Sequence, residues 1–577
     1  MKLIRNILST IVVCGVLAGC TDLDETLYSS VGTQNYYHTA LDVKRVVYRP
    51  FEHAYWTVTQ FHTPQELTGD QLITPQRDGW WDDSGVWRML QYHQYDQYAP
   101  YYTHIGGMWI AGFQGVGECN FVIEELARLN PNDFGLTRTD FNNFTSQARA
   151  LRAWFYIQLF DAFRNIPIWT DFSKSLPKDI KQAPPTETFR FIEKELLECL
   201  DPIEQKQSLG SQSNVQGRWT KAGVAALLVR LYLNAEAWIG EDRYDDCAKY
   251  AQRILDGEYG PYKVEDRWDA VFDWNNDTSD EMIFGFPSSG GYTYWAYQQE
   301  THWCTVPHNS NKYFGDIKCK AGTHNSQFAC SPSYDLYGKL YNYELGMTVN
   351  KFRKYPDDCR MVKYRNLGNS RREAMVVYGY LEYQEGGKTK RLTATGQNYT
   401  IYIRDAVGLF HDLAPTQWPN NKESNLSTGD HNSGWHFAKY PFYADSDEGQ
   451  LESDYAEIRL PEIIYSLAEC KLREGEIDAA AKLLNTVRRR YYPEKNYSTV
   501  LYAPEGEAEL DMDEMLDEWG REFLAEGRRR TDLIRFGKFS TGRWWDKNPD
   551  ADDHYQIFPL TTQVLNTNSN LKQNPGY

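Results

Sequence analysis

Two short segments of the chain combine aromatic rings with polar side chains and glycine. The first, residues 76–83, reads Gln-Arg-Asp-Gly-Trp-Trp-Asp-Asp. Flat rings stack on the apolar C–H faces of sugar rings, while carboxylates and guanidinium groups hydrogen-bond to sugar hydroxyls. Because neighbours in sequence cannot share one face of a helix, we expect at least one of the adjacent tryptophans outside the core. The candidate contact residues of this segment are Arg77, Asp78, Trp80, Trp81 and Asp82.

The second segment, residues 288–303, places further rings among serine, glycine and glutamine. Its adjacent glycines, Gly290 and Gly291, make burial a weaker explanation for these rings than ligand contact. Its candidate contact residues are Tyr294, Trp295 and Trp303. For every ring of both segments, packing in the core or between loops is the alternative. By contrast, Trp544 and Trp545 lie beside the C-terminal helical patterns, and we interpret them as packing residues.

The composition agrees with rings that face outward. Aromatic residues make up 15% of the 577 residues, with 41 Tyr, 26 Phe and 18 Trp. At 41% hydrophobic and 24% charged residues, the chain has the composition of a folded protein and not of a disordered one. Its net charge of −18 argues against nucleic acid as a partner. The same charge disfavours strongly anionic polymers only weakly, because local charge can override the net value.

The N-terminus has the pattern of a secretory signal. Lys2 and Arg5 precede an apolar stretch that is too short to span a bilayer as a stable helix. The stretch ends in Leu17-Ala-Gly-Cys20, which resembles a bacterial lipobox, in which the cysteine thiol is acylated and becomes the mature N-terminus. We therefore predict a signal peptide over residues 1–19 and a lipid anchor on Cys20. An ordinary signal peptide with an incidental cysteine is the alternative.

Metal binding has weak support in the sequence. Residues 273–281 alternate oxygen-bearing side chains as calcium loops do, but they lack the glycine and the distant glutamate of an EF-hand. Calcium is therefore the one cofactor left open, and otherwise none is expected. Histidines at 302, 308 and 324 lie among cysteines, but their spacing matches no zinc pattern. Disulfides remain open for the cysteines of this region, namely Cys304, Cys319, Cys330 and Cys359.

Catalysis has no clear signature either. Asp82 and Asp83 could suggest the carboxylate pair of a glycosidase. Such a pair must face across a sugar at roughly 5–9.5 Å and in two different environments. Adjacent residues of one loop do not supply that arrangement, so no catalytic residues are predicted.

The elements that position these segments are mainly helical. Helical periodicity and capping residues predict helices over 41–56, 108–129, 146–163, 186–200, 220–238, 244–255, 461–474, 477–490 and 513–526. Several form pairs with small residues at the crossing and resemble tetratricopeptide repeats. The middle of the chain is rich in Gly, Asn, Ser, Tyr and Trp, with strands predicted over 374–383 and 398–404. We expect one domain over 20–577, with a helical scaffold from 35–260 and 450–577 and a loop-rich, ligand-binding insertion over 261–449.

Several short motifs follow one another along the chain. They are Trp109 to Asn120, Arg149-Ala-Leu-Arg152 with Asn165-Ile-Pro167, Arg218-Trp-Thr-Lys-Ala-Gly, Asp358-Cys-Arg360, Arg459-Leu-Pro-Glu462, Glu526-Gly-Arg528 and the terminus Asn574-Pro-Gly-Tyr577. In this order they resemble the motifs of the SusD/RagB outer-membrane lipoproteins. The resemblance runs from Cys20 to Tyr577 and implies a mainly α SusD-like fold. It also implies a non-catalytic protein on the surface of the Gram-negative outer membrane. Such a protein captures a polysaccharide or oligosaccharide and delivers it to a TonB-dependent, SusC-like transporter.

Other functions stay open from the sequence. A secreted helical glycoside hydrolase or lyase would also be rich in Trp and Tyr, and it would need acidic residues that converge from separate segments. A repeat-based assembly scaffold would need no ligand. Within the family, some members capture peptides or other nutrients instead of glycans. The sequence does not name the ligand.

Overall fold

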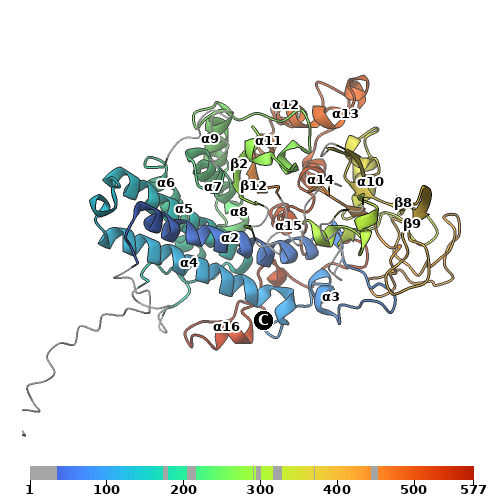
Figure 1. Ribbon diagram of the computed structural model, residues 1–577, viewed down its shortest axis with the longest axis horizontal. Helices are drawn as coiled ribbons and strands as arrows, with labels where there is room; N and C mark the ends of the chain where they lie inside the picture. The colour runs from blue at the N-terminus through green and yellow to red at the C-terminus, as the bar shows by residue number, and fades with distance from the viewer. Residues whose placement is uncertain are drawn as a thin grey trace, which may run out of the picture.

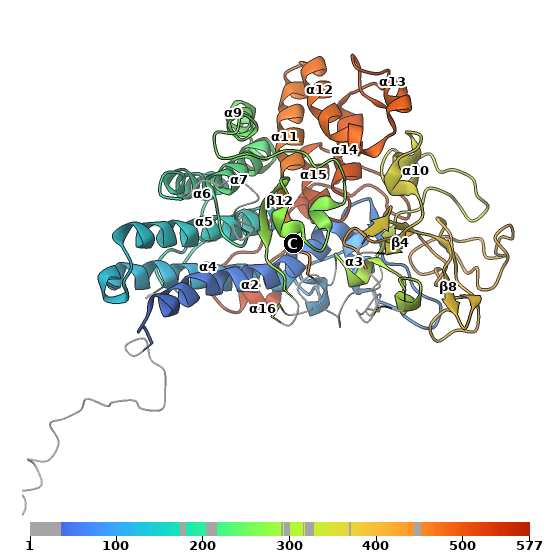
Figure 2. The same cartoon turned by 45° about the horizontal axis from the view of Figure 1, so that its top comes forward.

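The computed structural model describes residues 36–172, 180–203, 216–289, 292–293, 301–315, 317, 328–368, 371–442 and 452–577. Helices α4, α5 and α6 lie at one end of the molecule and the β8–β9 hairpin lies at the other (Figure 1). The helices α11, α12 and α14 lie together above the N-terminal helices (Figure 2). The predicted mainly α fold is therefore confirmed.

The N-terminal half of the chain supplies the longest helices. They are α2 (Ala40–Leu67), α3 (Val86–Gln91), α4 (Ile105–Arg128), α5 (Arg138–Phe163), α6 (Pro185–Cys199), α7 (Lys221–Leu233), α8 (Ala235–Ile239) and α9 (Tyr244–Leu255). The later helices are α10 (Thr348–Arg353), α11 (Leu460–Arg473), α12 (Ile477–Arg488), α13 (Tyr497–Val500), α14 (Met512–Glu522), α15 (Arg529–Arg535) and α16 (Thr562–Leu565). Within the described ranges, no helix combines the length and apolar composition needed to cross a membrane.

Local sequence explains where several helices begin. Thr39 and Thr137 each accept a hydrogen bond from the backbone of the aspartate three residues later, and that aspartate accepts one in return. Thr220 caps α7, as predicted, by accepting from the amide of Gly223 at 3.2 Å. These bonds satisfy amides that have no partner inside the helix.

The largest differences from the predicted helix boundaries lie in α2, α5, α7 and α14. Helix α5 begins at Arg138, capped by Thr137, although the pattern predicts its start at residue 146. Helix α2 continues to Leu67. Almost all of its second half is buried, so that half has no amphipathic pattern from which the helix could be predicted. Helix α7 ends at Leu233, where the side chain of Asn234 donates to the carbonyl of Arg230 at 2.8 Å. Helix α14 ends at Glu522, because the chain turns through positive φ at Ala525 and brings Glu526 to a buried arginine.

Helices α4 and α5 approach closely through glycine. A Cβ atom at Gly115 of α4 would lie only 2.1 Å from the Phe155 ring of α5, and one at Gly112 would lie 2.7 Å from Leu159. The space for these two side chains is supplied by the glycines of α4. The aromatic face of α5 fills that space and is fully buried.

The strands are short and pair antiparallel. The pairs are β1 (Leu72–Ile73) with β3 (Ala329–Cys330), β2 (Met282–Phe286) with β12 (Tyr455–Arg459), β4 (Arg365–Gly368) with β5 (Arg371–Glu373), β6 (Val376–Val377) with β11 (His436–Phe437), β7 (Gly379–Tyr380) with β10 (Tyr402–Ile403), and β8 (Glu382–Glu385) with β9 (Lys388–Arg391). The predicted segment 374–383 thus breaks into short strands with different partners. Of these strands, β7 pairs with β10, which lies in the other predicted segment, 398–404. Strand β8 pairs with β9 in a hairpin that turns at Gly386-Gly387.

Several tryptophans and cysteines are buried in the structure. Trp544 and Trp545 are buried, as predicted for packing residues. Four cysteines are buried small hydrophobes of the helical part, namely Cys119, Cys199, Cys247 and Cys470. In the loop-rich region no disulfide joins Cys304, Cys330 and Cys359 to one another. Cys319 lies outside the described residues.

Buried ion pairs join the two ends of the chain. Arg529 of α15 donates to both carboxylate oxygens of Asp70, at 2.6 and 3.1 Å, and both residues are almost fully buried. Asp70 also accepts from the amide of Gly346 at 2.7 Å. Burial by itself raises the pKa of Asp70, but the charge and hydrogen bonds of Arg529 outweigh it and lower that pKa to about 2.

This lowered pKa predicts a loss of stability in acid. The Asp70 contribution is fully present above pH 4 and disappears as the pH falls toward 2, because the unfolded state then binds the proton more readily. Between pH 5 and pH 3 the pair should lose about 1 kcal/mol of unfolding free energy. Asp70→Asn should cost roughly 3–5 kcal/mol at pH 5 and should be less acid-sensitive than the parent.

Urea unfolding of the parent and the variant at both pH values would measure this difference. Asp245→Asn, on the exposed side of α9, is the control. An Asp70→Asn variant with the parent's acid sensitivity would contradict the assignment.

Candidate functional site

The loop after β1, residues 74–85, is held by backbone hydrogen bonds to a distant segment. The amide of Gln76 donates to the carbonyl of Leu426 at 2.8 Å, and the amide of Asp78 donates to that of Gly429 at 3.1 Å. Within the loop, the amide of Trp80 donates to Arg77 O at 3.0 Å, and Arg77 N donates to Trp81 O at 3.0 Å. The loop is thus a closed turn fixed against residues 426–429. Below we call residues 76–83 the platform loop.

Arg77 supports this loop from below. It is fully buried, and its guanidinium donates to the carbonyls of Asp430 and Ser433 at 3.0 and 2.8 Å. The prediction that Arg77 offers a polar contact to a ligand does not fit this position. The physical reason is that its long side chain points into the body and satisfies backbone carbonyls there.

Trp80 is half-buried, and two imidazole rings flank it. The ring centroids of His308 and His431 lie 4.6 and 4.9 Å from the indole, both tilted. Gly396 lies against another edge, where a Cβ atom would be only 2.4 Å from the indole Cδ1. Burial lowers the pKa of His431 to about 3, with the nearby Arg77 acting in the same direction, so this ring is neutral at pH 7. Trp80 is therefore fixed in one orientation by its neighbours.

Trp81 and Asp78 stand at the surface of the same loop. Trp81 is half-buried, while the Asp78 and His411 side chains are 36% and 44% exposed and are joined by a hydrogen bond. The backbone of Asp78 has a positive φ of 31°, and its carbonyl accepts from the Gln397 amide at 2.6 Å. The short turn thus presents a ring, a carboxylate and an imidazole close together.

Asp82 is the most exposed polar residue of the loop. Its side chain is 53% exposed and accepts from Gln76 Nε2 at 2.6 Å and from Arg88 at 3.0 Å. Partial burial would raise the pKa of Asp82, but the bond from Gln76 and the charge of Arg88 outweigh it and lower that pKa. Asp82 is consequently a charged hydrogen-bond acceptor. Its neighbour Asp83 points inward and holds the start of α3.

The candidates of the second segment are placed differently. Tyr294, Trp295 and the side chain of Trp303 lie outside the described residues. Tyr292, just before them, is 92% exposed.

The sequence missed the partners that surround Trp80. His431, which lies against Trp80, and His411, which bonds the neighbouring Asp78, come more than three hundred positions after the tryptophans. His308, the other ring beside Trp80, enters the sequence analysis only as a zinc candidate. Local sequence carries no signal for this assembly. A histidine in a polar loop has many equivalent explanations.

The residues considered as calcium or zinc ligands bond to other groups of the protein. Asp273 pairs with Arg267 at 2.8 Å, and the Asn276 amide donates to the carbonyls of Val271 and Asp454. His302 is buried and bonds the carbonyl of Pro441 at 3.2 Å. Among the described residues, no group of three or more His, Cys, Asp and Glu side chains is arranged to hold a metal ion.

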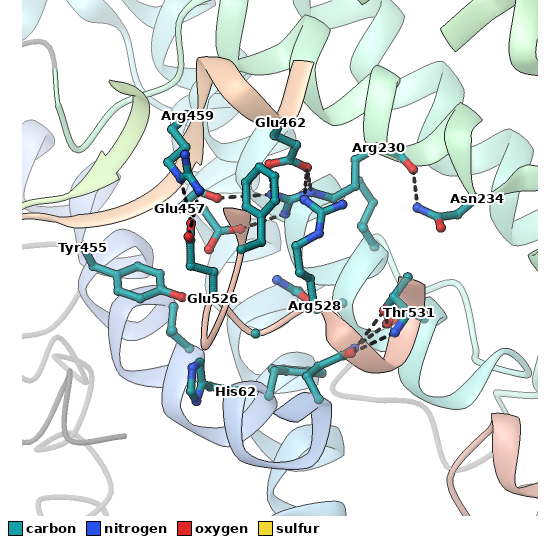
Figure 3. Close-up of a pocket in the computed structure, with 18 of the residues that line it drawn as sticks. His62, Arg230, Asn234, Tyr455, Glu457, Arg459, Glu462, Glu526, Arg528 and Thr531 are labelled. Carbon is teal, nitrogen blue, oxygen red and sulfur yellow. Dashed lines mark hydrogen bonds and ion pairs between the residues drawn. The ribbon is translucent and has the colours of Figure 1, made fainter. Parts of the chain in front are cut away.

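A small cavity lies inside the helical body (Figure 3). Arg230 of α7 donates to Glu462 and Glu457 at 2.9 and 2.8 Å, and Arg459 donates to Glu526 at 2.8 Å. The cavity measures about 70 Å³, far below the roughly 300–1,000 Å³ of ligand pockets. With its cations matched by carboxylates, this cavity has the size for a few waters and not for a sugar.

Comparisons with known proteins agree on one group. Residues 298–577 match a family model described as the SusD family, and residues 45–233 match one described as "Starch-binding associating with outer membrane". The starch-binding protein SusD of Bacteroides thetaiotaomicron is 25% identical over 472 residues, which cover 77% of this chain and 74% of that protein.

Solved structures show the same fold over nearly the whole length. NanU of B. fragilis matches with a TM-score of 0.64 and 17% identity, covering 95% of this chain and 99% of that one. A laminarin-binding SusD-like protein matches at 0.61 and 17%, covering 94% and 100%. Surface glycan-binding protein A of Bacteroides uniformis matches at 0.62 and 16%, covering 93% and 99%. At these identities the likeness concerns the fold.

The burial of Arg77 and the exposure of Asp82 predict opposite effects on stability. Arg77→Ala leaves two buried carbonyls without their donor and should lower the unfolding free energy by about 2–3 kcal/mol. Asp82→Ala removes only surface bonds and should change it by less than about 0.5 kcal/mol. Thermal denaturation of both variants checks this pair. An Arg77→Ala variant that melts with the parent would show that the guanidinium does not support the loop.

Proposed function

The chain belongs to the SusD family, and from this premise we propose that it is a non-catalytic, glycan-binding lipoprotein of the outer membrane. It captures a polysaccharide or oligosaccharide at the platform loop and delivers it to a TonB-dependent, SusC-like transporter. Cys20 carries the lipid anchor. The glycan-binding relatives named above support the ligand class, and the family supports the transporter and the compartment.

The observation that carries the proposal is the construction of the platform loop. Trp80 and Trp81 share one short turn, which backbone bonds to residues 426–429 hold in place. Around them Asp78, His411 and Asp82 offer partly exposed acceptors and donors for hydroxyl groups. A ring held in one orientation loses little conformational freedom when a sugar stacks on it. The loop is thus preorganised for a ligand with apolar faces and polar edges.

The second segment extends this proposal along the chain. We place Tyr294, Trp295 and Trp303 among the glycan contacts, as further rings for a ligand longer than one sugar. Stacking of one sugar on one ring contributes on the order of 1 kcal/mol, so a long glycan needs several rings to reach micromolar affinity, at about −8 kcal/mol. Arg77 does not belong to the proposed contact set, because it is buried. No cofactor is required by this mode of binding.

Substitution of the two tryptophans tests the site. Trp81→Ala should weaken glycan binding tenfold or more with little change in melting temperature, because its ring is only half-buried at the surface. Trp80→Ala should weaken binding and also lower stability, because His308 and His431 pack against it.

The measurement is affinity electrophoresis against a panel of polysaccharides, followed by titration calorimetry with the best binder. Phe172→Ala is the matched control, since this ring is 41% exposed on the helical side. Parent-like binding by both tryptophan variants would refute the platform. A reducing-sugar assay on the same panel tests the non-catalytic part.

Cys20 provides a separate test of the anchor. Cys20→Ala should abolish acylation and release the protein from the outer membrane, because the acyl chains bury many methylenes at about 0.8 kcal/mol each. Membrane fractionation and intact-mass measurement check this. Unchanged retention together with unchanged mass would refute the lipoprotein assignment.

A further inference from the structure

A groove of about 410 Å³ lies beside the platform loop and is used by nothing described so far. Three separate segments line it, residues 335–343, 422–424 and 543–548, and all of them are described. Its volume lies in the range of ligand pockets, unlike the small cavity of Figure 3.

One wall of the groove is aromatic. Tyr337 is 57% exposed, and the half-buried rings of Tyr341 and Tyr343 lie 5.3 Å apart at an angle of 35°. The floor below them is rigid, because Trp544 and Trp545 are buried there and Trp545 Nε1 donates to Ser424 Oγ at 3.3 Å. A firm floor with tyrosines above it suits a flat, partly apolar ligand such as a sugar ring.

Two cations of the groove have no ion-pair partner among the described residues. Within the described part of the chain, the exposed Lys422 and Arg543 have no carboxylate within ion-pair distance, and Arg543 lies 5.6 Å from the Tyr343 ring centroid. The other cation, Lys547, is already held by Asp550 at 2.7 Å. Two cations are therefore available to a ligand.

The acidic residues of the groove are engaged by the protein itself. Asp335 accepts from the amides of Tyr337 and Lys339 at 2.8 and 2.9 Å. Asp546 accepts from the Tyr92 hydroxyl at 2.6 Å and from the amide of Leu426 at 2.8 Å. Both carboxylates thus complete turns and neighbouring loops. In a chain with a net charge of −18, Lys422 and Arg543 are thus two surface cations without an ion-pair partner among the described residues.

We propose that this groove is a second saccharide site, specific for a sugar residue that carries an anionic group. The tyrosines stack on the ring, and Lys422 and Arg543 bind the carboxylate or sulfate of that residue. The inference rests on the proposed function in one respect, namely that the ligand is a glycan. It adds a place and a charge class that the platform loop does not provide.

The two sites are joined through one residue. The carbonyl of Leu426 accepts from Gln76 of the platform loop, and its amide donates to Asp546 of the groove. A glycan long enough to reach both sites binds as a bivalent ligand, with the second contact made at high effective concentration.

A charge-neutralising pair of substitutions tests the groove. The probes are tetrasaccharides of galacturonate and of glucuronate, each with its carboxyl-reduced counterpart, and a sulfated tetrasaccharide. The parent should bind the anionic probes at least tenfold more tightly than the reduced ones, with affinity falling as salt rises. The double variant Lys422→Ala with Arg543→Ala should lose that preference while keeping the parent's melting temperature.

Two further variants separate the explanations. Tyr337→Ala should weaken anionic and reduced probes alike, since it removes stacking only. Lys482→Ala, an exposed lysine on α12, should change nothing. The carboxylate and sulfate arms tell which anion the groove accepts, and a preference for either one that disappears in the double variant supports the site.

The proposal is overturned if the parent shows no preference for any anionic probe, or if the preference persists in the double variant. If it disappears only in Trp81→Ala, the anionic site is the platform loop, and the proposed function still stands. If neither anionic nor neutral glycans bind the parent, the proposed function itself fails.

Discussion

The rest of the structure depends on the buried ion pairs between Arg459 and three glutamates. Arg459 is 1% exposed, and its guanidinium bonds Glu522 at 2.5 Å, Glu526 at 2.8 Å and Glu281 at 3.3 Å. These carboxylates come from the C-terminal part of the chain and from the loop before β2. Removing one partner of such a pair leaves a buried charge without compensation, at roughly 3–5 kcal/mol. The helical scaffold is therefore held together by matched charges as well as by apolar packing.

The same kind of pair fixes the base of the candidate site. Arg529 holds Asp70 at the end of α2, and Gln71 donates to the carbonyl of Gly520 at 3.0 Å. Two residues later β1 begins, and from it the platform loop emerges. The loop therefore starts from a point that is anchored to the C-terminal helices. A site built on such a support keeps its geometry without a ligand.

The two concave features differ in what remains for a ligand. In the cavity of Figure 3 the three arginines, Arg230, Arg459 and Arg528, are each paired with a carboxylate of the protein. The carboxylate of Asp161 accepts hydrogen bonds from neutral side chains. In the groove near Tyr337 the two carboxylates accept hydrogen bonds from the protein. Lys422 and Arg543 have no ion-pair partner among the described residues. The paired charges that stabilise the fold and the two cations proposed to bind a ligand thus lie in different places. The aromatic residues divide in the same way, with Trp544 and Trp545 as floor and the tyrosines at the surface.

Local sequence determined the helices whose pattern is amphipathic, such as α9, which begins and ends where periodicity predicts, and α7, which begins at the predicted cap Thr220. The order of motifs determined the family, because these residues are spaced by the fold itself. Tertiary structure decided the rest. Arg77 is buried, and Trp80 packs between His308 and His431. Lys422 and Arg543 line one groove. Each of these facts joins residues far apart in the chain, and local propensity and periodicity depend only on near neighbours.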